Sequence, residues 1–256
     1  MPKIAFVEWA DGLTVGGSQW QDIKAQVCAA QADILITNEM PFGVWRPVDE
    51  TFDREEAQKW VEEHEQSLDA LGSLEVGAII SSRPLLIGDR LANEGFSLEN
   101  GQYTPLHHKH YFPSEQGWHE ASWFDKELAG FTVHQISGVN IALLLCTELM
   151  MNEEARFYGQ KGADLIAVPR ASGMNILNWE AACAMASVVS GAYVVSSNRV
   201  GETAPYTPEF GGHGLAYAPG GKRLANTDKN NNLKVIELDI EQSKYAKTQY
   251  PCHLRY

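Results

Sequence analysis

Short apolar runs alternate along this chain with segments in which apolar residues recur at helical spacing. Lys3 to Trp9 is rich in β-forming residues, Ser18 to Ala30 has the helical spacing, and Asp33 to Thr37 is again a compact apolar run. A strand, a helix and a second strand within so few residues are the signature of a parallel α/β layer. The sequence therefore predicts an α/β fold.

The same alternation continues along the rest of the chain. Further strands are expected at Glu75–Ile80, Phe131–Ile136, Val139–Leu145, Asp164–Pro169, Tyr193–Asn198 and Val235–Asp239. Further helices are expected at Asp53–Leu71, at Asn152–Lys161 with Asn152 as the N-cap, and at Asn178–Gly191. Asn100-Gly101 suits the two positive-φ positions of a type I′ turn, which predicts a hairpin from Leu91 to Leu106. Because no linker or repeat interrupts the pattern, residues 1–256 are expected to form one domain.

Charge and cysteine usage limit the partners. The formal net charge is -13, which disfavours nucleic acid and anionic membranes. No signal peptide and no apolar stretch long enough to span a membrane is found, so a cytoplasmic protein is expected. The scattered cysteines Cys28, Cys146, Cys183 and Cys252 show no metal-ligand spacing and are expected to be reduced thiols. Neither a metal nor a cofactor is expected.

Cys146 ends the apolar run Ile141–Leu145 and is followed by polar residues, with a helix a few residues later. A side chain at the carboxyl end of a parallel strand stands where α/β proteins place ligands, and nearby helix N-termini favour a thiolate. Free cysteines are, however, usually small buried hydrophobes, and position alone favours that interpretation.

Two other residues could take part in chemistry. Glu39 ends a buried strand, where partial desolvation would raise its pKa towards that of a useful base. It could equally be a loop glutamate in water. Lys109 follows the predicted hairpin among histidines, and it is either an anion-binding charge or a solvated loop residue.

The ordered set is more specific than its members. Glu39, Lys109, Glu120 and Cys146 follow one another at spacings of 70, 11 and 26 residues, and this order resembles the nitrilase (carbon–nitrogen hydrolase) superfamily. The resemblance extends from Ile4 to about Tyr250. The matching segments are Thr37–Gly43, His107–Phe112, Glu120–Phe124, Leu144–Arg156, Gly162–Pro169 and Gly191–Gly201.

The resemblance implies a role for each residue. Cys146 would be the nucleophile, activated by Glu39 as the base. Lys109 and the backbone N–H of Thr147 would stabilise the oxyanion. Glu120 would orient Lys109 or the substrate; Glu115 competes for this role, but the spacing to Cys146 favours Glu120.

The fold that the resemblance implies is a four-layer αββα sandwich, and members usually pair through their helices. A homodimer or higher homo-oligomer is therefore expected. The small residues of Asn178–Gly191 would suit such packing, although helix packing within one chain would explain them as well.

Several residues depart from the family pattern and affect the substrate. Asn38 replaces a common proline, Thr147 a common aromatic residue, and Gly211–Gly214 has glycine where serine is common. Glu148 stands where amidases often have aspartate and true nitrilases glutamate. A small linear amide or carbamoyl compound is the expected substrate, and a nitrile is the alternative.

Four aromatic or cationic side chains are candidate pocket residues. Arg170 could bind a substrate carboxylate bidentately, or it could be paired with a local acid. Tyr111, Trp118 and Trp123 could form an apolar wall, although such aromatics are more often core residues.

Two other functions remain open. A thiol redox sensor or binding protein would need neither Lys109 nor Glu39. A class I glutamine amidotransferase would have glycines around its nucleophile, and Leu145-Cys146-Thr147 lacks them.

Overall fold

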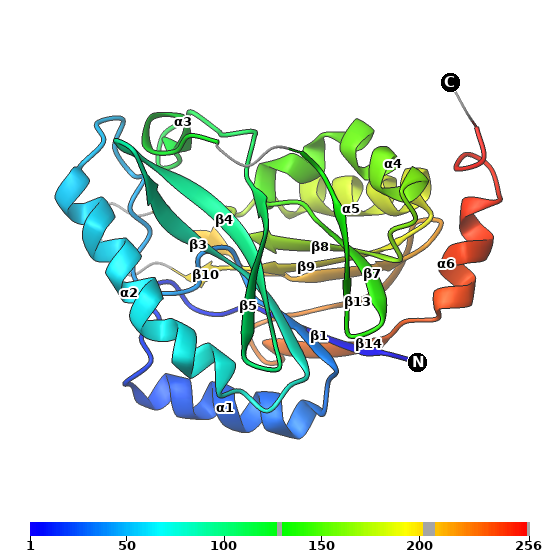
Figure 1. Cartoon of the computed structure of the whole chain (residues 1–256), viewed down its shortest axis with the longest axis horizontal. Helices are drawn as coiled ribbons and strands as arrows, with labels where there is room; N and C mark the ends of the chain where they lie inside the picture. The colour runs from blue at the N-terminus through cyan, green and yellow to red at the C-terminus, as the bar shows by residue number, and fades with distance from the viewer. Residues whose placement is uncertain (127–129, 202–207, 255–256) are drawn as a thin grey trace.

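Two six-stranded sheets form the centre of the fold in the computed structural model, which describes residues 1–126, 130–201 and 208–254 (Figure 1). The first sheet has the order β14-β1-β2-β3-β4-β5, with β1 (Lys3–Val7), β2 (Ile34–Ile36), β3 (Ala78–Ile87), β4 (Arg90–Glu99), β5 (Gln102–His108) and β14 (Leu233–Glu237). The second has the order β13-β12-β9-β8-β7-β6, with β6 (Val133–Ile136), β7 (Val139–Leu143), β8 (Leu165–Arg170), β9 (Tyr193–Asn198), β12 (Leu215–Ala218) and β13 (Lys222–Asn226). Strands β10 (Val200–Gly201) and β11 (Phe210–Gly211) pair separately.

Helices cover the outer face of each sheet (Figure 1). They are α1 (Ser18–Ala30) and α2 (Arg54–Gly72) on the first sheet, and α4 (Asn152–Gln160) and α5 (Ile176–Ser190) on the second. The short helix α3 (Glu120–Trp123), the 3₁₀ turn η1 (Cys146–Met150) and the C-terminal α6 (Ile240–Lys247) complete the chain.

The alternation of side chains explains the layers. In β1, Ile4 and Phe6 pack in the core between the sheets, whereas Ala5 and Val7 pack in the core beneath the outer helices. Because successive side chains of a strand point to opposite faces, a strand covered on both sides must be apolar throughout. The continuous apolar runs of the sequence are therefore strands of a four-layer αββα sandwich, as predicted.

The predicted hairpin is confirmed, with Asn100 at φ 51° and Gly101 at φ 76° between β4 and β5. Asn152 as N-cap was wrong: Met151 occupies that position and Asn152 is the first residue of α4. The reason is that η1 runs into the helix, since Met151 N–H donates to Glu148 O and Met151 O accepts from Glu154 N–H. Strands β12 and β13 and helices α3 and α6 were not predicted.

The carboxyl ends of the parallel strands meet at one edge of the sandwich. Strands β1, β2 and β3 are parallel to one another, as are β7, β8 and β9, and Glu39 N–H beyond β2 donates to Arg170 O at the end of β8. Ligands of α/β folds bind at such an edge.

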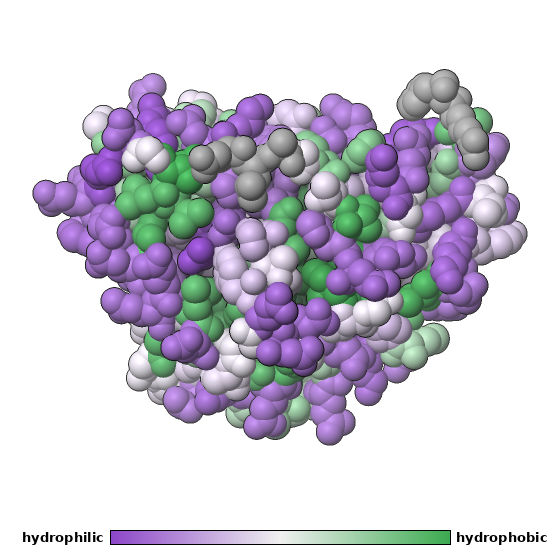
Figure 2. Space-filling model, viewed as in Figure 1, coloured by the Kyte–Doolittle hydropathy of each residue, from purple (hydrophilic) through white to green (hydrophobic). Residues whose placement is uncertain are grey.

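The outer surface differs from this interior. Figure 2 shows a face that is mostly hydrophilic, with hydrophobic residues in smaller groups. Among the described residues, no helix is both long and apolar enough to cross a membrane.

We expect Gly159→Ala to destabilise the fold, because α4 and α5 approach closely at this glycine. A Cβ at Gly159 would lie 2.3 Å from Ser190 O and 2.6 Å from Ser190 Cα. Overpacking of this kind costs about 1–3 kcal/mol of unfolding free energy, measurable by urea denaturation. Gly72→Ala is the matched control, since its Cβ would meet nothing within 4 Å and should be neutral or slightly stabilising. Equal urea midpoints for the two variants would contradict this prediction.

Candidate active site

Cys146 is the first residue of η1, shortly after the end of β7, and its backbone is strained. Its φ is 50°, in the left-handed region that residues other than glycine rarely adopt, at a cost of about 1–3 kcal/mol. The residue is only 3% exposed, and its thiol lies 3.7 Å from the carbonyl oxygen of Ala171. Such strain persists where surrounding structure maintains it, and it often marks a functional position.

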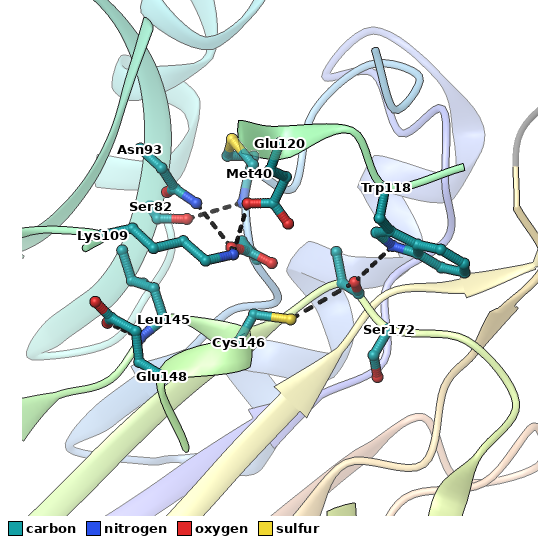
Figure 3. Close-up of polar contacts among 12 residues, drawn as sticks. Met40, Ser82, Asn93, Lys109, Trp118, Glu120, Leu145, Cys146, Glu148 and Ser172 are labelled. Carbon is teal, nitrogen blue, oxygen red and sulfur yellow. Dashed lines mark hydrogen bonds and ion pairs between the residues drawn. The ribbon is translucent and has the colours of Figure 1, made fainter. Parts of the chain in front are cut away.

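Lys109 is held between two carboxylates at the end of β5. Its Nζ donates to Glu39 Oε1 at 2.9 Å and to Glu120 Oε2 at 2.6 Å, and all three side chains are fully buried. Asn93 on β4 also donates to Glu39 Oε1, at 2.7 Å. The Lys109 amine, the Glu120 carboxylate and the Cys146 thiol are directed towards one region (Figure 3). The structure thus brings together the four residues that were predicted as catalytic.

Burial and neighbouring charges determine how this cluster is protonated. Burial opposes the charge of Lys109, but the Glu120 and Glu39 carboxylates outweigh it and raise the pKa of the amine above its ordinary value. Burial raises the pKa of Glu120 to about 7, against the opposing effect of Lys109. Burial also raises the pKa of the Cys146 thiol, and Glu39 raises it further, so the thiol is protonated at neutral pH.

One oxygen of each carboxylate has no hydrogen-bond partner among the described residues. Glu39 Oε2 and Glu120 Oε1 are both buried and unpaired, although the other oxygen of each accepts from Lys109. Buried polar atoms without partners are costly. These two oxygens can therefore take a proton from a thiol or water, or accept a hydrogen bond from a ligand.

A buried ion pair holds the loop of Glu39. Arg199 donates to Asp11 and to the carbonyl oxygens of Met40 and Gly43, the latter at 3.0 Å. Arg199 and Asp11 have fully buried side chains. Removal of either partner would leave a buried charge unpaired, so the pair is expected to persist. Through its hydrogen bonds to Met40 and Gly43, Arg199 holds the backbone next to Glu39.

Glu148 joins the backbone beside Lys109 to the backbone beside Cys146. Its Oε1 accepts from the His110 N–H at 2.7 Å, and its Oε2 accepts from the Leu145 N–H at 2.8 Å. His107 Nε2 lies 3.0 Å and 2.8 Å from the same two oxygens. Glu148 is fully buried, so its carboxylate is a structural link rather than part of the pocket wall.

A cavity of about 510 Å³ opens above Cys146. Among the described residues its lining includes Glu120, Cys146, Thr147, Glu115 and Trp118, together with Pro113, Met150, Ala171, Ser172, Gly173, Met174, Asn175, Asn178 and Trp179. A cavity of this size accommodates a small organic molecule. No group of residues able to hold a metal ion is found in the part of the chain that is described.

Three residues predicted to bind substrate lie outside this lining. The Tyr111 hydroxyl donates to Glu154, and the Trp123 indole N–H donates to Asp49 O. Arg170 lies behind the wall and donates to the carbonyl of His213 and to serine hydroxyls at 3.0 and 3.2 Å. Thr147 and Trp118 do line the cavity, and so does Glu115.

Sequence reasoning did not identify Asn93, Asp11 or Arg199 as site residues, and it considered Glu148 only as a hint about the substrate. Their side chains contact segments of the site that are distant in sequence. The local sequence around Asn93 and Asp11 carries no signal for this. Arg199 falls within a segment that matches the family, which is the one indication that the sequence offered.

The sequence pattern of the carbon–nitrogen hydrolase family matches residues 16–250. The chain belongs to the carbon–nitrogen hydrolase family. The comparison with curated proteins found no match.

Solved structures of carbon–nitrogen hydrolases have the same fold. A carbon–nitrogen hydrolase from Helicobacter pylori G27 has a TM-score of 0.86 at 18% identity, covering 98% of this chain and 94% of that one. Saccharomyces cerevisiae Nit3, a member of branch 10 of the nitrilase superfamily, has a TM-score of 0.78 at 17% identity, with 98% and 94% covered. A variant of the amidase from Nesterenkonia sp. AN1, with the acetamide moiety of fluoroacetamide covalently added at its active-site cysteine, has a TM-score of 0.78 at 18% identity, with 97% and 94% covered.

We expect Glu148→Gln to lower both stability and turnover. An amide replaces one carboxylate oxygen with a donor, so a buried backbone N–H of Leu145 or His110 loses its acceptor. The cost is about 1–3 kcal/mol of unfolding free energy, measurable by urea denaturation. Glu154→Gln, at a partly exposed carboxylate that accepts from Tyr111, should shift the urea midpoint far less. An unchanged midpoint for Glu148→Gln would show that these contacts do not support the site.

Proposed function

We propose that this protein hydrolyses the C–N bond of a small linear amide or carbamoyl compound through a thioester on Cys146. The observation that carries the proposal is the buried Lys109 amine between Glu39 and Glu120, beside a thiol at the base of a cavity. A structural lysine needs only one carboxylate. Two carboxylates, each with an unpaired oxygen, equip the site for proton transfer.

The first half-reaction forms the thioester. Glu39 takes the thiol proton as the Cys146 sulfur attacks the carbonyl carbon, because the raised pKa keeps the thiol protonated until a base acts. The Lys109 ammonium and the backbone N–H of Thr147 stabilise the tetrahedral oxyanion. Collapse breaks the C–N bond, and Glu39 returns its proton to the departing ammonia or amine.

The second half-reaction releases the acid. Glu39, again ionised, takes a proton from a water molecule as the oxygen of that water attacks the thioester carbonyl. The new tetrahedral oxyanion is stabilised by the same donors, and its collapse breaks the C–S bond. The sulfur recovers the proton from Glu39, which leaves a carboxylic acid and the original enzyme.

An amide is favoured over a nitrile as the substrate, because the one residue that suggested a nitrile has a structural role. Glu148 prompted that alternative, but its carboxylate is occupied by backbone N–H groups and does not contribute to the described cavity lining. The acetamide adduct on the cysteine of the Nesterenkonia amidase variant is in keeping with an amide. A thiol sensor is disfavoured because it would need neither the Lys109 amine nor the Glu39 carboxylate that are buried together at this site.

Self-association through α5 is a further part of this proposal. Met174, Leu177 and Met185 on or beside α5 are exposed by 58%, 75% and 48%. Large apolar side chains that are exposed to solvent suit an interface between copies of the chain. Sedimentation analysis would identify the oligomer.

We expect a covalent acyl adduct on Cys146 when the enzyme is quenched during turnover of an amide panel. Intact mass followed by peptide mapping would locate it and give the mass of the acyl group. Cys146→Ala should show no adduct, and Lys109→Met should lower kcat by about 10²–10³-fold through loss of an oxyanion donor. A panel in which only nitriles release ammonia would replace the amide proposal by the nitrile alternative. Turnover that survives both substitutions would exclude this mechanism.

We expect kcat/KM to fall as the pH drops below about 7, where the Glu120 carboxylate becomes protonated. A neutral Glu120 attracts the Lys109 ammonium less strongly. The ammonium then interacts more strongly with the Glu39 carboxylate, which becomes a weaker base. The pH–rate profile of Glu120→Gln should lack this acidic limb and show a lower plateau. Circular dichroism would establish that the variant is folded. The same limb in the folded variant would assign the titration to another group.

A further inference from the structure

We propose that the substrate carries a positive charge at one end, and that Glu115 and Trp118 bind this charge at the mouth of the cavity. The inference rests on the proposed amide hydrolysis and specifies its substrate class. It concerns the outer part of the cavity, away from the group that reacts with Cys146.

The described wall of the cavity contains acidic but no basic residues. Glu115 and Glu120 are the charged side chains among the described lining residues, and no lysine, arginine or histidine is among them. Lys109 is engaged by Glu39 and Glu120. A substrate carboxylate would therefore meet carboxylates without a counter-charge, whereas an ammonium would meet a partner.

Arg170 does not offset the negative charge of the cavity wall. Its Nε, Nη1 and Nη2 already donate to Ser196, Ser172 and the His213 carbonyl. Its guanidinium lies 4.7 Å from the ring centre of Trp179, which belongs to the described cavity lining, whereas Arg170 does not. The expectation that Arg170 binds a substrate carboxylate is therefore not supported by its position.

Trp118 is held in place as a wall beside the nucleophile. Its indole N–H donates at 3.2 Å to Ala171 O, the same carbonyl oxygen that lies near the Cys146 thiol. Phe210 packs edge-on against the ring, and the absence of a side chain at Gly173 leaves room for it. Figure 3 shows Trp118 on the other side of Cys146 from Lys109. A substrate chain that extends from Cys146 away from Lys109 thus passes the indole ring of Trp118, and aromatic rings of this kind attract cations.

Glu115 stands at the exposed rim next to this ring. Its backbone exchanges two hydrogen bonds with Trp118, of 3.2 and 2.8 Å, so one turn fixes both residues. Glu115 is an exposed residue and belongs to the cavity lining. An ammonium above Trp118 can therefore also pair with Glu115. The net charge of -13 adds a field that draws cations towards the enzyme.

The test compares matched amides at low salt by release of ammonia or amine. With the charge on the acyl side, the series is δ-aminovaleramide, its neutral isostere hexanamide and the anionic adipamate. With the charge on the amine side, it is N-acetylputrescine against N-pentylacetamide. In at least one series we expect the cation to exceed its neutral isostere in kcat/KM by about tenfold, a preference reduced in about 0.5 M NaCl. Adipamate should be the poorest substrate.

Variants assign the preference to the residues. Glu115→Gln should remove most of the ratio between cationic and neutral amides, and Trp118→Leu should reduce it. Glu65→Gln, on the exposed face of α2, changes the net charge equally and should retain the ratio. The inference is overturned if neutral or anionic amides are hydrolysed as well as cationic ones, or if the ratio survives Glu115→Gln.

A binding measurement separates this inference from the proposed function. Calorimetry with the Cys146→Ala variant should show, in at least one of the two series, tighter binding of the cationic amide than of its neutral isostere, and Glu115→Gln in that background should abolish the difference. Binding of the cation without turnover of any amide by the unmodified enzyme would reject the hydrolase mechanism and retain the cation site. Turnover without this difference in binding would do the reverse.

Discussion

The buried ammonium of Lys109 is the constraint on which the rest of the site depends. Removing a charge from water is costly unless partners replace the water, and here two carboxylates do so. Those carboxylates come from the loop after β2 and from α3, so the charge can be buried only if both segments close around β5. Arg199 holds the Glu39 loop, and Glu148 links the backbone beside Lys109 to that beside Cys146. The Leu145 N–H that donates to Glu148 directly precedes the strained Cys146 backbone.

The two ends of the cavity are built from different kinds of interaction. Near Cys146, buried charges with fixed partners set the protonation of each group, and burial raises the pKa of both the thiol and Glu120. At the mouth, Glu115 is exposed and Trp118 provides an aromatic wall. A charge in the buried part controls reactivity because it is poorly screened, whereas a charge at the mouth discriminates among substrates. The reaction and its selectivity can therefore vary independently.

Much of the fold could be predicted from local pattern. The runs predicted as strands at Lys3–Trp9 and Asp164–Pro169 correspond to β1 and β8, which are apolar because both of their faces are covered. Asn100-Gly101 formed its turn because those residues tolerate positive φ. Helix α6 and strands β12 and β13 were not predicted, because their stability comes from packing and pairing rather than local periodicity. Asn152 was wrongly assigned as the N-cap because the η1 turn before it continues into α4.

The candidate site divides in the same way. The order Glu39, Lys109, Glu120 and Cys146 along the chain, through its family resemblance, was enough to predict the family and to select the candidate reacting groups. The tertiary structure alone decided that Arg170 is engaged behind the wall, that Glu148 is a buried link, and that Glu115 stands at the mouth. The physical reason is that residue type and order determine what chemistry a side chain can perform. The direction in which it points depends on strands that are distant in sequence and pair only in the folded chain.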